Sequence, residues 1–229
     1  MRAAGRPSSP GELASEAGPQ GLEVTPVRRD EGAGRGIRSV CVYCASSTGS
    51  DGRFAETAAA LGTLLAGEGI RVVFGGGRVG LMGVLADAAL AAGGEVVGVI
   101  PTGLFRREIA HRGVTELHEV ASMHERKQRM FDLADAFVAL PGGFGTLEEL
   151  AEVTTWAQLG LHRKPIVVLD VGGFFDPLFA FLDGAVEAGL LKPANRALVV
   201  RVDRLEELLP TLAAYAPPSA EKWITAEET

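Results

Sequence analysis

Short apolar runs rich in β-branched residues alternate with longer amphipathic stretches from Ile37 onward. The short runs predict strands near 38–44, 70–74, 95–100, 136–140, 165–169 and 197–202, with a weaker strand at 115–120. The amphipathic stretches predict helices near 51–68, 80–92, 122–134, 146–160, 174–188 and 203–214. Continuous apolar strands that alternate with helices are typical of α/β proteins, so we predict a Rossmann-like parallel sheet with helices on both faces.

The same pattern sets the domain organisation. A chain of 229 residues can bury one sizeable core, so we predict a single domain over residues 37–215. Residues 1–36 are rich in Gly, Pro, Ala, Arg and Glu and lack a periodic apolar pattern, which is typical of a disordered tail. Residues 216–229 are expected to form a loose C-terminal extension.

Charge and hydropathy narrow the classes of partner. The net charge of −7 argues against a nucleic-acid surface, although a few local Arg or Lys residues can still hold one phosphate. No apolar run approaches the ~20 residues that a membrane span needs, and residues 1–36 lack the apolar segment of a secretory signal. We therefore expect a cytoplasmic protein that contacts neither nucleic acid nor membrane, and a small anionic ligand is still allowed.

The cysteines and histidines give no metal pattern. Cys41 and Cys44 lie in the predicted strand CVYC, where they would point to opposite faces, so we expect packed thiols rather than a redox or metal pair. The histidines show no ligand spacing such as HExxH; they are His111, His118, His124 and His162. We expect neither a metal ion nor a cofactor.

The first glycine loop, FGGGRVGLMG, directly follows a predicted strand. Ligands of parallel sheets bind beyond the carboxyl ends of the strands, which is where this loop lies. Gly75, Gly77 and Gly80 satisfy GxGxxG, and Glu95 lies near the distance of a ribose-binding acid, so an NAD site is one interpretation. Glycines that only allow close helix–strand packing are a second. We favour a third, in which the backbone of Gly75, Gly76 and Gly77 cradles a phosphate or ribose.

The second glycine loop, PGGFGTLEE, follows the apolar strand AFVAL. Gly142, Gly143 and Gly145 allow backbone conformations closed to other residues, and we predict that Thr146 caps the next helix. Free N–H groups at such a helix N-terminus favour an anion, so a phosphate fits there.

Charged residues accompany the second loop on both sides. Glu148 and Glu149 follow it, and acids in a first helical turn can simply complement the helix dipole. On the preceding helix, SMHERKQRM, the side chains of Arg126, Lys127 and Arg129 gather positive charge suited to phosphate. The alternative for this helix is a solvated basic face.

Hydrophobic residues on the same helix should contribute to the core. We predict that Met123 and Met130 pack inward.

Together these segments resemble a known family. MHERK and PGGFGTLEE, with FGGGRVGLMG upstream and TWAQLG downstream, are similar to the LONELY GUY (LOG) group of cytokinin riboside 5′-monophosphate phosphoribohydrolases, which has also been labelled "possible lysine decarboxylase". The resemblance covers about residues 37–215. It implies a Rossmann-like homodimer that hydrolyses the N-glycosidic bond of N6-substituted AMP and releases an adenine-type base and ribose 5-phosphate.

The resemblance also implies site residues. The PGGxGTxxE pattern is matched by Pro141, Gly142, Gly143, Gly145, Thr146 and Glu149, with Phe144 at the variable position, and the RK pair by Arg126 and Lys127. A family acid falls on Glu108 in RREIAHRG, where the surrounding residues depart from the usual pattern. The polar residue of the following helix falls on Thr155, with Thr154 as the alternative. Ser46 and Ser47, in the loop after the first strand, are expected to approach the ligand.

The chemistry of N-glycosidic cleavage suggests roles for these residues. The reaction builds positive charge on the sugar, so a carboxylate near the anomeric carbon stabilises the transition state. We assign this role to Glu149, with Glu148 as the alternative, and expect Arg126 to hold the ribose or phosphate and to orient the carboxylate.

Two other functions remain open. One is a non-catalytic nucleotide-binding module on the same fold. The other is a pyridoxal phosphate enzyme that uses Lys127 or Lys164.

Overall fold

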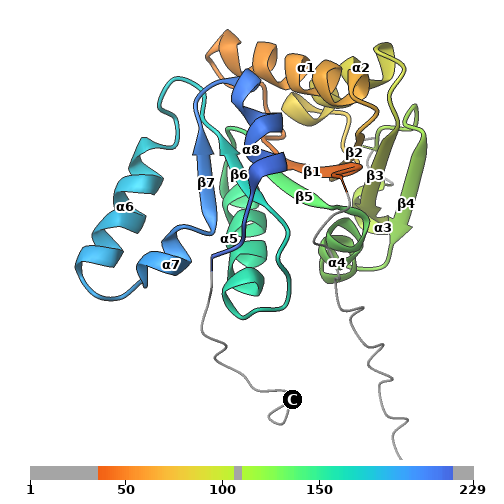
Figure 1. Cartoon of the computed structure of the whole chain (residues 1–229). Helices are drawn as coiled ribbons and strands as arrows, with labels where there is room; N and C mark the ends of the chain where they lie inside the picture. Colours follow the sequence, from red (N-terminus) through yellow and green to blue (C-terminus); the bar gives the residue numbers. More distant parts are fainter. Residues whose placement is uncertain (1–35, 106–109, 219–229) are drawn as a thin grey trace, which may run out of the picture. The chain divides into compact units, whose positions relative to one another are not determined.

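A computed structural model of the chain describes residues 36–105 and 110–218. Its centre is a seven-stranded sheet with the order β4-β3-β2-β1-β5-β6-β7, in which all neighbouring strands are parallel (Figure 1). The strands are β1 Ser39–Tyr43, β2 Arg71–Phe74, β3 Val96–Pro101, β4 Glu116–Val120, β5 Ala136–Ala139, β6 Ile166–Leu169 and β7 Val199–Val202. The predicted fold class and the weaker predicted strand, now β4, are confirmed.

The helices also follow the predicted order. They are α1 Gly52–Gly67, α2 Gly80–Ala91, α3 Thr102–Phe105, α4 Met123–Leu133, α5 Phe144–Gln158, α6 Asp176–Glu187, α7 Pro193–Arg196 and α8 Leu208–Ala214, with a 3₁₀ turn η1 at Leu205–Glu207. The short helices α3 and α7 were not predicted. Within residues 36–105 and 110–218, no helix is long and apolar enough to cross a membrane.

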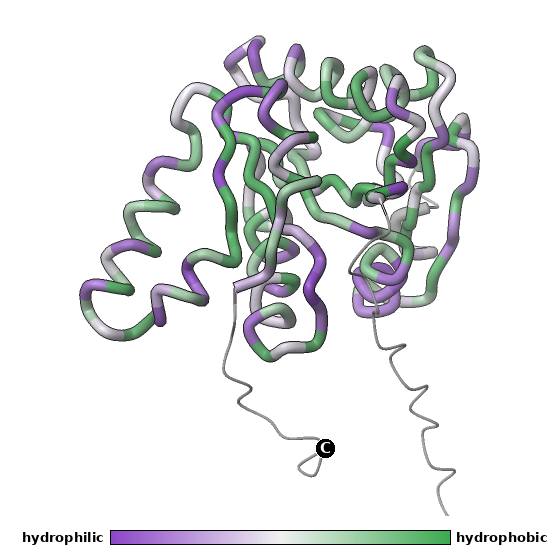
Figure 2. The backbone as a smooth tube through the Cα atoms, in the orientation of Figure 1, coloured by the Kyte–Doolittle hydropathy of each residue, from purple (hydrophilic) through white to green (hydrophobic). Residues whose placement is uncertain are grey.

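Two apolar clusters fill the two faces of the sheet. One joins the strands to α1, α2 and α8, and the other joins them to α4, α5 and α6. Figure 2 shows hydrophobic strands between helices that carry hydrophilic positions. Cys44 belongs to the first cluster and Cys41 to the second, and burial raises the pKa of both thiols. The prediction of packed thiols on opposite faces is therefore confirmed.

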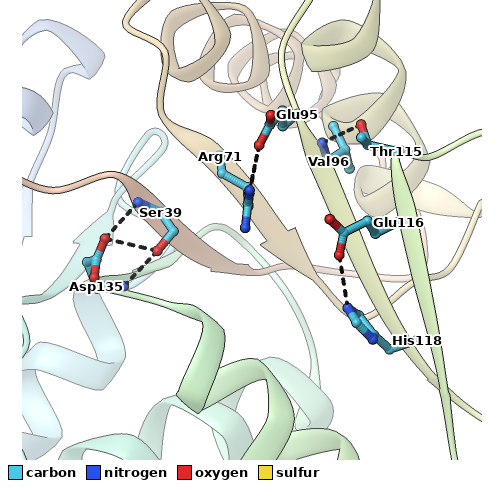
Figure 3. Close-up of polar contacts among 8 residues, drawn as sticks. All are labelled: Ser39, Arg71, Glu95, Val96, Thr115, Glu116, His118 and Asp135. Atoms are coloured by element: carbon cyan, nitrogen blue, oxygen red, sulfur yellow. Dashed lines mark hydrogen bonds and ion pairs between the residues drawn. The ribbon is translucent and has the colours of Figure 1, made fainter.

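Polar contacts join the strands at the edge of the sheet where they begin (Figure 3). The carboxylate of Asp135, just before β5, accepts hydrogen bonds of 3.0 Å from both the hydroxyl and the backbone N–H of Ser39. The hydroxyl of Thr115, just before β4, accepts a 3.0 Å bond from the N–H of Val96. Side chains thus join neighbouring strands at the amino edge, while the carboxyl edge carries the glycine loops.

Glu95 lies at the amino edge as well. Its carboxylate forms a 2.7 Å ion pair with Arg71 at the start of β2 (Figure 3). A ribose bound beyond the carboxyl ends of the strands would lie at the opposite edge. The interpretation of Glu95 as a ribose-binding acid of an NAD site is therefore wrong.

Helices α1 and α2 approach each other at a glycine. A Cβ atom on Gly62 of α1 would lie 3.0 Å from the backbone nitrogen of Ala89 and closer still to the carbonyl oxygen of Leu85, both on α2. Backbone atoms cannot rotate away as a side chain can, so this position requires glycine.

We predict opposite outcomes for two alanine substitutions on α1. Gly62→Ala should lower the free energy of unfolding by about 1–3 kcal/mol because it forces the two helices apart. Gly67→Ala, in open space at the end of the same helix, should leave it unchanged or raise it by up to about 1 kcal/mol. Urea denaturation measures both values. Equal stabilities of the two variants would contradict the close approach.

Candidate active site

The candidate site lies where the strand order reverses, at the carboxyl ends of β1, β2 and β5. The loop after β1 connects both glycine loops, because the N–H of Ala45 donates to the carbonyl of Pro141 at 3.2 Å and its carbonyl accepts from Leu81 at 3.1 Å. A reversal of strand order is the usual ligand position in open α/β sheets. The topology therefore brings the predicted segments together.

The first glycine loop is packed against its surroundings. Gly75, Gly76 and Gly77 are buried, and Gly76 has a φ of +73°. A Cβ atom on Gly76 would lie 3.2 Å from the backbone of Val99, and one on Gly75 would occupy the place of the Arg126 guanidinium. Close packing thus requires glycine at positions 75 and 76. Gly75 in addition makes room for a predicted site residue.

The second glycine loop is open by comparison. Gly143 and Gly145 are exposed, and α5 begins at Phe144 with no side-chain cap. Thr146 is the buried third residue of this helix, and its hydroxyl lies against Gly142, where a Cβ atom would not fit. The prediction that Thr146 caps the helix is therefore wrong. The uncapped N-terminus retains N–H groups and a positive dipole end suited to an anion.

An ion pair joins α4 to α5 beside this helix end. The Arg126 guanidinium lies 3.3 Å from the Glu149 carboxylate, and the two side chains are only 12% and 11% exposed. Arg126 also donates from Nε to the carbonyl of Val99 at 3.1 Å, which fixes the guanidinium against β3. Burial raises the pKa of Glu149, and the charge of Arg126 opposes that rise only in part.

A second cross-helix pair lies beside the first but nearer the surface. Lys127 contacts Glu148 at 2.5 Å and Glu152 at 2.9 Å, and these hydrogen bonds raise the pKa of the lysine. Glu152 was missed, although its spacing of four residues from Glu148 places the two acids on one helix face. The adjacent acids Glu148 and Glu149 thus have different partners and different exposure.

These pairs settle several alternatives. Neither Glu148 nor Glu149 lies in the first turn of α5, so the helix-dipole interpretation of the two acids is wrong. On α4, the interpretation as a solvated basic face holds only for Arg129, which is exposed.

The two methionines of α4 differ from each other. Met130 is buried as predicted, whereas Met123 is 46% exposed at the start of α4, so the prediction for Met123 is wrong.

The remaining predicted residues are less closely connected. Ser46 and Ser47 are exposed in the loop after β1, and their shared peptide lies where a Cβ atom on Gly80 would point. The hydroxyls of Thr154 and Thr155 each donate 2.7 Å bonds to carbonyls four residues earlier on α5. Glu108 lies outside the described residues.

The lysines do not fit a pyridoxal phosphate site. A Schiff-base lysine needs a lowered pKa, whereas that of Lys127 is raised by its two acids. The Lys164 amine donates to the carbonyl of Phe131 at 2.9 Å and lies 3.9 Å from the centre of its ring. Among the described residues, no group of three His, Cys, Asp or Glu side chains is arranged to hold a metal ion.

A separate cavity of about 350 Å³ lies at the carboxyl ends of β6 and β7. Its lining includes Arg53, Asp170 and Asp203 but none of the predicted site residues. Asp170 is buried and paired with Arg201 at 2.7 Å. The cavity is therefore distinct from the Arg126–Glu149 pair.

We predict that Glu149→Gln stabilises the protein as pH rises. A raised pKa means that folding favours the protonated carboxyl, so the wild-type protein loses stability as Glu149 ionises above pH 4.5. The variant lacks this loss, so its free energy of unfolding should rise relative to that of the wild type between that pH and the raised pKa of Glu149, and the difference should then level off. Urea denaturation between pH 4 and 8 measures the difference. Glu148→Gln is the control, because its exposed carboxylate stays hydrated. If the difference in free energy of unfolding between Glu149→Gln and the wild type stayed constant from pH 4 to 8, burial would not raise the pKa of Glu149.

Comparisons with known proteins identify a family and relatives of this chain. The profile of the family described as "possible lysine decarboxylase" matches residues 82–212. The cytokinin riboside 5′-monophosphate phosphoribohydrolase LOG of Oryza sativa subsp. japonica is 46% identical over 79% of this chain and 75% of its own length. The enzyme of that name from Arabidopsis thaliana, LOG1, is 46% identical over 79% of this chain and 85% of its own length.

Solved structures show the same fold at lower identity. The Moco carrier protein from Chlamydomonas reinhardtii has a TM-score of 0.59 and 20% identity, over 78% of this chain and 96% of that chain. The molybdenum cofactor binding protein from Rippkaea orientalis has a TM-score of 0.58 and 22% identity, over 77% and 94%. At these identities the likeness establishes the architecture alone.

Proposed function

The chain belongs to the LOG family of cytokinin riboside 5′-monophosphate phosphoribohydrolases, and we propose that it hydrolyses the N-glycosidic bond of N6-substituted adenosine 5′-monophosphates. The products are an adenine-type base and ribose 5-phosphate. The observation that carries the proposal is the largely buried Arg126–Glu149 pair beside the uncapped N-terminus of α5.

Glu149 is the proposed catalytic carboxylate. Cleavage of the bond builds positive charge at C1′, and a carboxylate in a poorly hydrated site stabilises that charge more strongly than one in water. The ionised form can also orient a water molecule and accept its proton as the water attacks C1′. Arg126 favours the ionised form and fixes its direction. Glu148 is exposed and paired with Lys127, so we assign it to holding α4 against α5.

The helix end supplies the proposed phosphate site. Backbone N–H groups of Gly143, Phe144, Gly145 and Thr146 lie at the uncapped N-terminus of α5, where an anion is favoured. Glu149 follows Phe144 by five residues, a rise of about 7–8 Å along the helix. That length is on the scale of a ribose 5-phosphate, so one substrate can reach both groups.

The other proposed contacts complete the site. Gly142 gives the loop its close approach to Thr146, and the first glycine loop, Gly75 to Gly77, supports Arg126. We propose that Ser46 and Thr155 also contact the substrate; Glu108, which the resemblance adds to this set, lies outside the described residues.

We also propose a cytoplasmic homodimer. Exposed apolar side chains lie along and just after α5, with Phe144 93% exposed; the others are Leu147, Leu159 and Leu161. Exposed apolar side chains of this kind are typical of a surface that a second protein copy covers. Both cysteines are free thiols, which agrees with a reducing compartment.

The catalytic proposal predicts unequal effects of two adjacent substitutions. Glu149→Gln should lower kcat by about 10²–10⁴-fold with little change in nucleotide affinity, because it removes the carboxylate that acts in the transition state. Glu148→Gln should lower kcat by less than about tenfold. Chromatography of the free base released from AMP, N6-substituted AMP and the matching riboside measures these rates.

The same assay tests the rival function. The riboside should react more slowly than the monophosphate because it lacks the positioning that the phosphate provides. Nucleotide binding without release of base would instead indicate a non-catalytic binding module. Wild-type turnover by a Glu149→Gln variant that binds nucleotide normally would remove Glu149 from the mechanism.

The dimer has its own test. Leu147→Asp should convert the dimer into monomers in sedimentation velocity runs, because a charge cannot be buried unpaired in an apolar interface. Leu190→Asp is a matched control, since this leucine is exposed beyond the end of α6. A monomeric wild-type protein, or equal effects of the two substitutions, would contradict the proposed interface.

A further inference from the structure

A buried histidine outside the candidate site makes a specific set of contacts. His111 is 4% exposed, and its Nε2 atom lies 2.8 Å from a carboxylate oxygen of Asp87 on α2. Its Nδ1 atom accepts a 3.3 Å hydrogen bond from the N–H of Gly113. Because Nδ1 accepts, the ring proton lies on Nε2 and is donated to Asp87.

The backbone of the same segment pairs with the first glycine loop. The N–H of His111 donates to the carbonyl of Gly76 at 2.8 Å, and Ala110 forms an isolated antiparallel bridge with Gly77. The loop is therefore held from one side by residues 110–111. The His111 side chain joins that segment to α2, the helix that directly follows the first glycine loop.

The first glycine loop in turn limits where the Arg126 side chain can lie. Gly75 has no room for a Cβ atom because the guanidinium occupies it, and Gly76 packs on Val99. The carbonyl of Val99 accepts the hydrogen bond from Arg126 Nε. A shift of the loop therefore changes the space available to the guanidinium, and with it the geometry of the Arg126–Glu149 pair.

We propose that His111 and Asp87 are positioning residues that fix the first glycine loop and thereby orient Arg126 toward Glu149. The Asp87 side chain is 64% exposed, and a hydrogen bond to an acceptor that water also reaches contributes little to stability. The contact with Asp87 instead sets the direction of the imidazole ring. The kinetic consequences rest on the proposed hydrolase function, whereas the structural consequence does not.

Two substitutions of His111 test the roles of its two ring nitrogens separately. In His111→Gln the amide nitrogen can replace Nε2 and donate to Asp87, while in His111→Asn the amide oxygen can replace only Nδ1. Asp87→Ala removes the acceptor from the surface of α2 and leaves the buried ring intact. Ser39→Ala is the control, because it removes both hydrogen bonds of the Ser39 hydroxyl at the opposite edge of the sheet (Figure 3).

We expect His111→Asn and Asp87→Ala to lower kcat for the nucleoside monophosphate by about 10-fold or more, since small misplacements of catalytic groups are costly. Nucleotide affinity should change by less than about threefold. His111→Gln should recover most of the rate, and Ser39→Ala should keep the wild-type rate even if its stability falls. Wild-type kcat in Asp87→Ala, or equal losses in His111→Gln and His111→Asn, would overturn the proposal.

A spectroscopic readout keeps the inference separate from the catalytic proposal. The Arg126 Nε–H resonance, assigned with Arg126→Lys, reports its hydrogen bond to Val99 in the protein without nucleotide. It should shift in His111→Asn and Asp87→Ala and stay in place in Ser39→Ala. If no base is released by the wild type, the proposed function fails while this test still stands. An unshifted resonance in both variants would refute the positioning role directly.

Discussion

Burial of the Glu149 carboxylate costs free energy, and one guanidinium offsets that cost only in part. The pKa of Glu149 remains above its ordinary value even with Arg126 3.3 Å away, so the pair is not the arrangement that stability alone would select. Arg126 can reach this position only because Gly75 lacks a side chain and the Val99 carbonyl accepts its Nε–H. Several elements of the fold are thus constrained by one buried ion pair.

The topology explains how distant segments meet there. The chain builds β1 to β4 in one direction and then returns through α4 to place β5 beside β1. That return brings α4, which carries Arg126, next to α5, which carries Glu149. Polar contacts at the amino edge join neighbouring strands, and the two glycine loops lie at the other edge. One loop is buried and supports the arginine, while the other is exposed and offers an uncapped helix end.

The sequence predicted the sheet well because buried parallel strands are short apolar runs that need no partner to be recognised. Local signals were less reliable at helix starts. Thr146 has the residue type of a cap, yet the glycines before it allow α5 to begin earlier, so its hydroxyl packs on Gly142 instead. Met123 was expected inside, but at the start of α4 it remains exposed.

Contacts between residues far apart in the sequence could not be predicted from local sequence patterns. The spacing of Glu95 suggested a ribose contact, whereas the predicted strand 95–100 begins at this residue, and the strand register confirms that Glu95 lies at the amino edge. The separate partners of Glu148 and Glu149 depend on how α4 crosses α5. The same holds for the contact of Gly75 with Arg126, which joins residues far apart in the sequence. The motifs therefore predicted which residues gather, and the packing of the helices determines which of them interact.

The most direct test of this account is a crystal structure of the Glu149→Gln variant with N6-substituted AMP. The account predicts the phosphate on the backbone N–H groups at the start of α5, with the substituted side chain facing C1′ and the Arg126 guanidinium beside it. A ribose turned away from that side chain, or a nucleotide bound in the cavity at β6 and β7, would contradict it.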